Sequence, residues 1–111
     1  MLMFCSDAGT GMSPEEVQTA AMEGCDDWTE TMLRRGYLRG GAGLRPAADA
    51  TTLRVRDEQV LLSDGPFAET RDQIGGFSLI ECPDLDEALR AAAEHPWAKV
   101  GQVEVRPVWE P

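Results

Sequence analysis

Two carboxylates, Asp64 and Glu69, are the side chains most suited to chemistry in this sequence. Both lie in a polar stretch, residues 63–76, between two apolar runs. Two carboxylates on one loop can divide the roles of general acid and general base, provided that burial raises the pKa of one of them. Asp64 is also an ideal turn residue before Gly65 and Pro66, and Glu69 can cap the residues that follow it. The structural interpretation is the stronger, and the two are compatible, since an Asp fixed in a turn is well placed to meet a ligand.

Three arginines, Arg45, Arg54 and Arg71, can clamp a carboxylate or a phosphate. In a chain of formal net charge −10 they are more simply surface ion-pair partners. Arg54 lies in a predicted strand, and its charge needs a partner if its face of the sheet is covered.

Aromatic side chains are more often core than pocket lining, and this applies to Trp28, Phe77 and Trp97. Phe67 differs, because it follows Asp-Gly-Pro in a loop and can close a pocket mouth or reach a partner subunit. From the arginines and the aromatic residues together, we take Trp28, Arg54, Phe67 and Arg71 as the candidate ligand-binding residues.

The cysteines and the single histidine predict neither a metal site nor a cofactor. Cys5, Cys25 and Cys82 are widely spaced and form no CxxC pair, so neither a disulfide framework nor structural zinc is indicated. Cys25 is expected to be a small buried apolar residue, since the sequence offers no base beside it. His95, before Pro96, is expected to face solvent at a helix end.

The composition of the chain limits which partners it can bind and in which cellular compartment it is expected. A net charge of −10 argues against nucleic acid and against anionic membrane surfaces. Free thiols, the lack of a leader-like N-terminus and the lack of any apolar run of membrane-spanning length predict a cytoplasmic protein. A length of 111 residues predicts one domain, residues 1–111.

A long helix is the best-marked element. Ser13, Pro14 and Glu16 form the start of a capping box, apolar residues recur at helical spacing, and Gly36 follows the last turn. Gly24 lies within this helix, where it allows either close packing or a local bend.

The remaining elements complete an α+β pattern. Leu53 and Val55 alternate with charged residues, which predicts a half-buried strand that pairs with the next one as a β-hairpin. The expected order is a strand at 1–5, the helix, an irregular strand at 37–44, a hairpin at 51–56 and 59–63 with its turn at 57–58, a strand at 76–82, a helix from Asp84 and a strand at 101–108.

This order predicts a ferredoxin-like antiparallel sheet with helices on one face. The other sheet face also carries apolar residues and needs a cover. We expect a second copy to supply it, in a twofold homodimer with the sheets face to face.

Several segments together resemble the DGPF-domain proteins of the YCII-related family. They are residues 64–70, which read Asp-Gly-Pro-Phe-Ala-Glu-Thr, with Gly-Gly-Phe at 75–77, Asp-Leu-Asp-Glu-Ala at 84–88 and Val-Glu-Val-Arg-Pro-Val at 103–108. The resemblance implies the dimeric α+β barrel form of the fold. Most members of that family have no assigned activity, and their genes often lie beside sigma-factor genes in bacteria.

A few YCII-type relatives act as small-molecule lyases and are thought to use a His–Asp pair in the cleft between helix and sheet. This chain departs from that pattern, because its one histidine, His95, is not on the long helix. Asp64 is the family-typical carboxylate that it retains. Two function classes follow: a small-molecule-binding or accessory protein that uses the helix–sheet cleft, and, as the alternative, a lyase or isomerase with Asp64 as general acid or base.

Overall fold

The computed structural model describes residues 1–7, 11–65 and 73–109. The strands are β1 (Leu2–Cys5), β2 (Leu38–Gly43), β3 (Thr51–Arg56), β4 (Gln59–Asp64), β5 (Ile74–Ile80) and β6 (Gln102–Val105). The helices are α1 (Pro14–Met22), α2 (Cys25–Arg34), α3 (Leu85–Glu94) and α4 (Trp97–Val100), with a short 3₁₀ helix η2 (Ala47–Asp49). No helix in these described ranges is long and apolar enough to cross a membrane.

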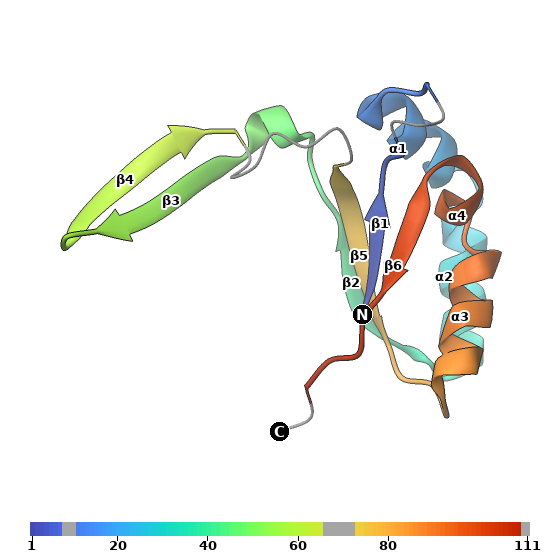
Figure 1. The fold of residues 1–111 in the computed structure, drawn as a ribbon. Coiled ribbons are helices and arrows are strands. Elements are labelled where there is room, and N and C mark those ends of the chain that lie inside the picture. Colours follow the sequence, from blue (N-terminus) through green and yellow to red (C-terminus); the bar gives the residue numbers. More distant parts are fainter. Residues whose placement is uncertain (8–10, 66–72, 110–111) are drawn as a thin grey trace.

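Four strands form the main sheet in the order β2-β5-β1-β6, and every neighbouring pair is antiparallel. The four helices cover one face of this sheet (Figure 1). Helices α1 and α2 connect β1 to β2, and helices α3 and α4 connect β5 to β6. In the sheet, β5 lies between β1 and β2, and β1 lies between β5 and β6. Two such units with their helices on one face make the ferredoxin-like arrangement. The predicted α+β, ferredoxin-like fold is confirmed.

The core lies between β1 and the helical layer. Leu2 and Phe4 point from β1 toward buried side chains of all four helices: Val17, Ala21, Trp28, Met32, Ala91, Ala92 and Trp97. The indole Nε1–H of Trp28 donates to the carbonyl oxygen of Ala91 at 2.9 Å, which links α2 to α3. Apolar burial and this satisfied indole together hold the helices on the sheet.

The predicted long helix is two helices. The capping box at Ser13 is present, with Ser13 Oγ accepting from the Glu16 amide at 3.2 Å, but α1 ends at Met22 and α2 begins at Cys25. Gly24 adopts φ +84°, a left-handed conformation that interrupts the helical hydrogen bonds. The prediction of one continuous helix was wrong, and of the two roles left open for Gly24 the bend is the one observed.

The C-terminal half follows the predicted order with one addition. Asp84 Oδ1 accepts from the Glu87 amide at 2.8 Å and caps α3, as expected. After His95, the chain turns at Pro96 into the short helix α4, which was not predicted. The last strand therefore spans only Gln102–Val105 instead of 101–108.

The hairpin forms a separate two-stranded sheet, which we call the arm (β3 and β4). Its turn is at Asp57 and Glu58, as predicted, and both residues have positive φ, 51° and 64°, as type I′ turns require. The arm extends away from the main sheet on the side opposite the helices (Figure 1). Leu53 and Val55 are exposed, so the prediction of a half-buried strand was wrong for this chain taken alone.

The approach of α4 to β1 gives a stability prediction. A Cβ at Gly101 would collide with the carbonyl oxygen of Cys5 and lie 2.9 Å from Trp97 Nε1. That carbonyl accepts the Trp97 Nε1–H at 2.7 Å, so a shift would strain or break this bond. We expect Gly101→Ala to lower the free energy of unfolding by roughly 2 kcal/mol, measured by urea titration.

Gly43→Ala is the matched control, because a Cβ at Gly43 meets no atom within 4 Å and the residue does not have a positive φ. Equal stability of the two variants would contradict the packing described here.

Candidate functional site

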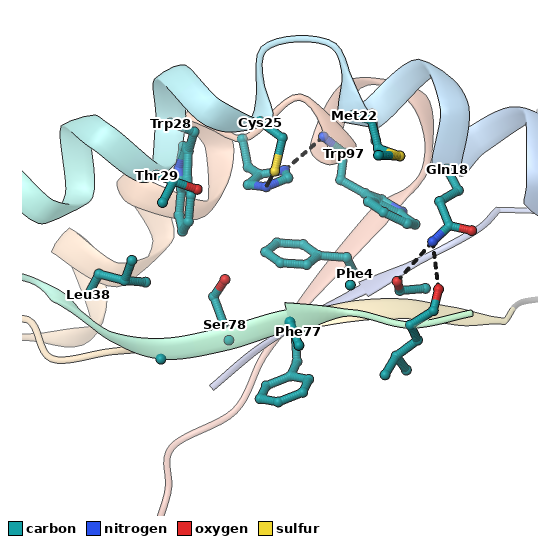
Figure 2. A pocket seen from close by; sticks show the side chains of 18 of the residues that line it. Phe4, Gln18, Met22, Cys25, Trp28, Thr29, Leu38, Phe77, Ser78 and Trp97 are labelled. Atoms are coloured by element: carbon teal, nitrogen blue, oxygen red, sulfur yellow. Dashed lines mark hydrogen bonds between the residues drawn. The ribbon is translucent and has the colours of Figure 1, made fainter. Parts of the chain in front are cut away.

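A cavity of about 590 Å³ lies between the helical layer and the main sheet (Figure 2). Its roof comes from α1 and α2, with Met22, Cys25, Trp28 and Thr29. Its floor comes from β2 and β5, and its end wall from Phe4, His95 and Trp97. This volume lies within the range of small-molecule sites, about 300–1,000 Å³.

The floor is open because β2 is rich in glycine. Gly40, Gly41 and Gly43 all line the cavity. A Cβ at Gly41 would lie 2.6 Å from the Phe77 carbonyl oxygen and 3.0 Å from the Ser78 Oγ, so β2 must pass β5 here without a side chain. A strand with ordinary side chains could not approach β5 this closely, and the bare backbone leaves room for a ligand.

The end wall is an aromatic cluster centred on Phe4. The Phe4 ring stacks on His95 with centroids 4.2 Å apart and on Trp97 at 5.8 Å, and Trp28 meets it edge-on at 6.3 Å. These rings are buried and held by neighbours on three different elements. The cluster therefore forms a rigid apolar wall that suits a flat molecule.

His95 is buried in this wall, and the expectation that it faces solvent was wrong. Its side chain is 2% exposed. Because Pro96 turns the chain into α4 directly after it, the ring folds back under α2 and stacks on Phe4 instead of pointing out along the axis of α3. Burial lowers the pKa of His95 from 6.5 to about 4, so the ring is neutral at pH 7.

The hydrogen bonds of His95 define its tautomer. Nδ1 accepts the backbone N–H of Trp97 at 3.0 Å, so in the neutral ring the proton resides on Nε2. Nε2 lies 3.8 Å from the Sγ of Cys25. His95 is therefore a hydrogen-bond donor toward Cys25 and not a base that could remove its proton.

Cys25 lines the cavity and is partly exposed, whereas a buried apolar role was expected. The sequence showed no base near it, yet the fold brings His95 next to it across seventy positions. Burial raises the pKa of the Cys25 thiol, a hydrogen bond from Thr29 lowers it and Asp26 raises it further. The net effect is upward, so the group is a thiol at neutral pH.

Ser78 supplies a polar group on the floor. It is 8% exposed, and Figure 2 shows its hydroxyl directed toward the cavity. Within the described ranges its Oγ makes no hydrogen bond and is accessible from the cavity. At the rim, the side-chain Nε2 of Gln18 donates to the carbonyl oxygens of Leu44 at 2.7 Å and Gly75 at 3.4 Å.

Charge is nearly absent from the lining. Among the described lining residues, Arg45 is the only one with a permanent charge, and it lies exposed at the mouth, paired with Asp49 at 3.0 Å. The other contributors are apolar, amide, hydroxyl or thiol groups and the neutral imidazole. The cavity is thus suited to hold an uncharged molecule.

The sequence-predicted site residues are placed in different parts of the fold. Trp28 lines the cavity, whereas Arg54 lies on the arm and Asp64 lies exposed at the end of β4, outside the described lining. Glu69, Phe67 and Arg71 lie outside the described residues. Sequence reasoning did not select His95, Cys25, Ser78 or the β2 glycines, although the glycine cluster at 40–43 was visible as a site of close backbone approach.

The chain belongs to the YCII-related family. The YCII-related domain profile matches residues 1–111, which confirms the resemblance found in the sequence. A protein of Rhizobium meliloti (strain 1021), described as uncharacterized protein R00369, is 42% identical over 83 residues, which cover 68% of this chain and 67% of that protein.

The buried imidazole makes stability depend on pH. Unfolded His95 titrates near 6.5 and the folded residue near 4, so the unfolded state takes up the proton first as the pH falls. The contribution of the neutral His95 to the free energy of unfolding is fully present above pH 6.5. As the pH falls from 6.5 to about 4, this free energy decreases by about 3 kcal/mol. Urea titrations between pH 7.5 and 4 measure it.

His95→Asn is the control, because an Asn oxygen can still accept the Trp97 N–H but does not titrate. Carboxylates contribute equally to the pH dependence of the free energy of unfolding in both proteins. The difference between the two pH dependences is therefore the contribution of His95. Since His95 is the only histidine, its Cε1–H NMR signal also reports its pKa directly. A midpoint near 6.5 in the folded protein would contradict the buried neutral ring.

Proposed function

We propose that this YCII-related protein binds a small molecule in the cavity between its helices and its main sheet. The observation that carries the proposal is a preformed cavity of about 590 Å³ with an apolar aromatic wall and a glycine floor. The cavity opens to solvent at its mouth, so a molecule that enters it replaces water against mostly apolar walls, which favours binding. A few converging polar groups on mostly apolar walls are the usual composition of ligand sites.

Binding is better supported than catalysis by the groups in the cavity. Cys25 is a protonated thiol and His95 is a neutral donor, so the pair lacks the base that a nucleophile needs. The alternative, a lyase or isomerase with Asp64 as general acid or base, stays a prediction. The exposed position of Asp64 on β4 adds no support to it.

We also propose that the protein acts as a homodimer, and the arm supports this. Cross-strand partners share a face, so Leu53 with Leu62 and Val55 with Val60 form one apolar face, and all four side chains are exposed. A hairpin standing alone is marginally stable in water, and an apolar face of this kind calls for a cover.

A second copy is the cover that meets both needs at once. Phe77 points from the main sheet away from the helices (Figure 2), and its cross-strand partner Met3 shares that outer face. The arm projects on the same side (Figure 1). In a twofold dimer the outer sheet faces pack together and each arm lies against the other subunit, so both apolar surfaces are covered in both copies.

All three cysteines are free thiols, which supports our proposal that the protein works in the reducing cytoplasm.

Filling the cavity should abolish small-molecule binding. Thr29 lines the roof on α2 and its side chain faces the cavity in Figure 2. We expect Thr29→Phe to remove the mass of any small molecule that copurifies with the wild-type protein in native mass spectrometry. It should also raise the Kd of any aromatic fragment found by ligand-observed NMR at least tenfold.

Thr19→Phe is the matched control, because Thr19 is exposed on α1 and does not line the cavity. Equal loss in both variants would point to a general folding defect. Unchanged binding in Thr29→Phe would place the ligand elsewhere and contradict the proposal.

Adjacent leucines on the arm test the dimer. Leu62 is 66% exposed on the apolar face, and Leu61 is 46% exposed on the opposite face beside Arg54. We expect the wild-type protein and Leu61→Lys to be dimers in light scattering coupled to size exclusion. Leu62→Lys should dissociate at least tenfold more readily, since it places a charge in the interface. A monomeric wild-type protein, or equal effects of the two substitutions, would overturn the proposed arrangement.

A further inference from the structure

The floor of the cavity presents a hydroxyl, that of Ser78, which no described residue engages. Trp28 Nε1–H donates to the Ala91 carbonyl oxygen at 2.9 Å, and Trp97 Nε1–H donates to that of Cys5 at 2.7 Å, so both indoles are already satisfied. Ser78 is 8% exposed as a residue, and its hydroxyl faces the cavity, where it stays accessible and has no partner among the described residues. A hydroxyl that is open only toward a cavity is free to donate a hydrogen bond to a molecule bound there, in place of water.

The roof opposite Ser78 offers donors and no charge. His95 Nε2–H points toward Cys25 Sγ at 3.8 Å, so the S–H of Cys25 is not used in this contact. Donors at the roof and at the floor match an acceptor oxygen on the ligand better than an N–H group.

A charged ligand would lack a counter-charge in this cavity. The single permanent charge among the described lining residues, Arg45, lies at the mouth and is neutralised by Asp49. An anion or a cation bound deeper would be desolvated without compensation, and the net charge of −10 opposes an anion further. The aromatic wall of Phe4, Trp28 and Trp97 favours a flat ring system.

We propose that the cavity recognises an uncharged aromatic molecule with a carbonyl oxygen, and that the Ser78 hydroxyl donates to this oxygen. The inference rests on the proposed small-molecule function of the same cavity and specifies its ligand class. Ser78 is a specificity-determining residue in this scheme, since it separates a carbonyl compound from a hydrocarbon of the same shape.

Three probes of matched size test the proposal on the full chain: acetophenone, ethylbenzene and benzoate. Binding is measured by titration of the ¹⁵N-labelled protein, with the Trp28 and Trp97 indole signals as reporters and the exposed Trp109 as reference. We expect acetophenone to bind about fivefold more tightly than ethylbenzene, as one net hydrogen bond implies, and benzoate to bind more weakly than either.

Ser78→Ala should reduce the preference for acetophenone over ethylbenzene to none, while Ser63→Ala, an exposed serine on the arm, keeps it. A preference that survives in Ser78→Ala, or benzoate binding as tight as that of acetophenone, overturns the ligand class. Equal wild-type affinities for acetophenone and ethylbenzene overturn it too, even if Ser78→Ala does not fold, and leave small-molecule binding intact. Lack of any indole shift with all three probes overturns the proposed function itself.

Discussion

The stacking of His95 on Phe4 is the contact on which the rest of the structure depends. It joins the segment after α3 to the central strand β1, and the Nδ1 of the same ring accepts the backbone N–H that opens α4. Through α4, Trp97 is held against β1 by its bond to the Cys5 carbonyl oxygen. One neutral imidazole thus packs in the core, accepts the amide at the start of a helix and forms part of the end wall of the cavity, and protonation of its Nδ1 would remove the acceptor for the Trp97 amide.

Most of the fold was predictable because its signals are local. The capping residues Ser13 and Asp84, the alternation in β3 and the turn at Asp57 and Glu58 all act within a few positions of the chain. The break at Gly24 was harder, since a glycine in a helical pattern signals a weak point without saying whether the chain bends there. Tertiary packing against Pro96, whose Cγ lies 3.4 Å from a Cβ at Gly24, accompanies the bend.

The candidate site was much less predictable, because it is made by contacts between distant segments. Cys25 is the first residue of α2 and His95 follows the last residue of α3, and their proximity depends on how α3 and α4 fold over β1. Motif reasoning selected Asp64 and its neighbours because loops with charged residues often carry function, yet the described cavity is apolar and sits beneath the helices. Ser78 carries no sequence signal, since a serine in a strand is ordinary until its neighbours are known.

The arm leaves and rejoins the main sheet at two strands that are already neighbours. The amide of Leu44 donates to the carbonyl oxygen of Gly75 at 2.8 Å, so β2 and β5 remain hydrogen-bonded to one another up to the point where the arm departs. The sheet and its helices therefore close without any help from the inserted hairpin. A change in the length or the surface of the arm can therefore leave the strand pairing of the main sheet as it is.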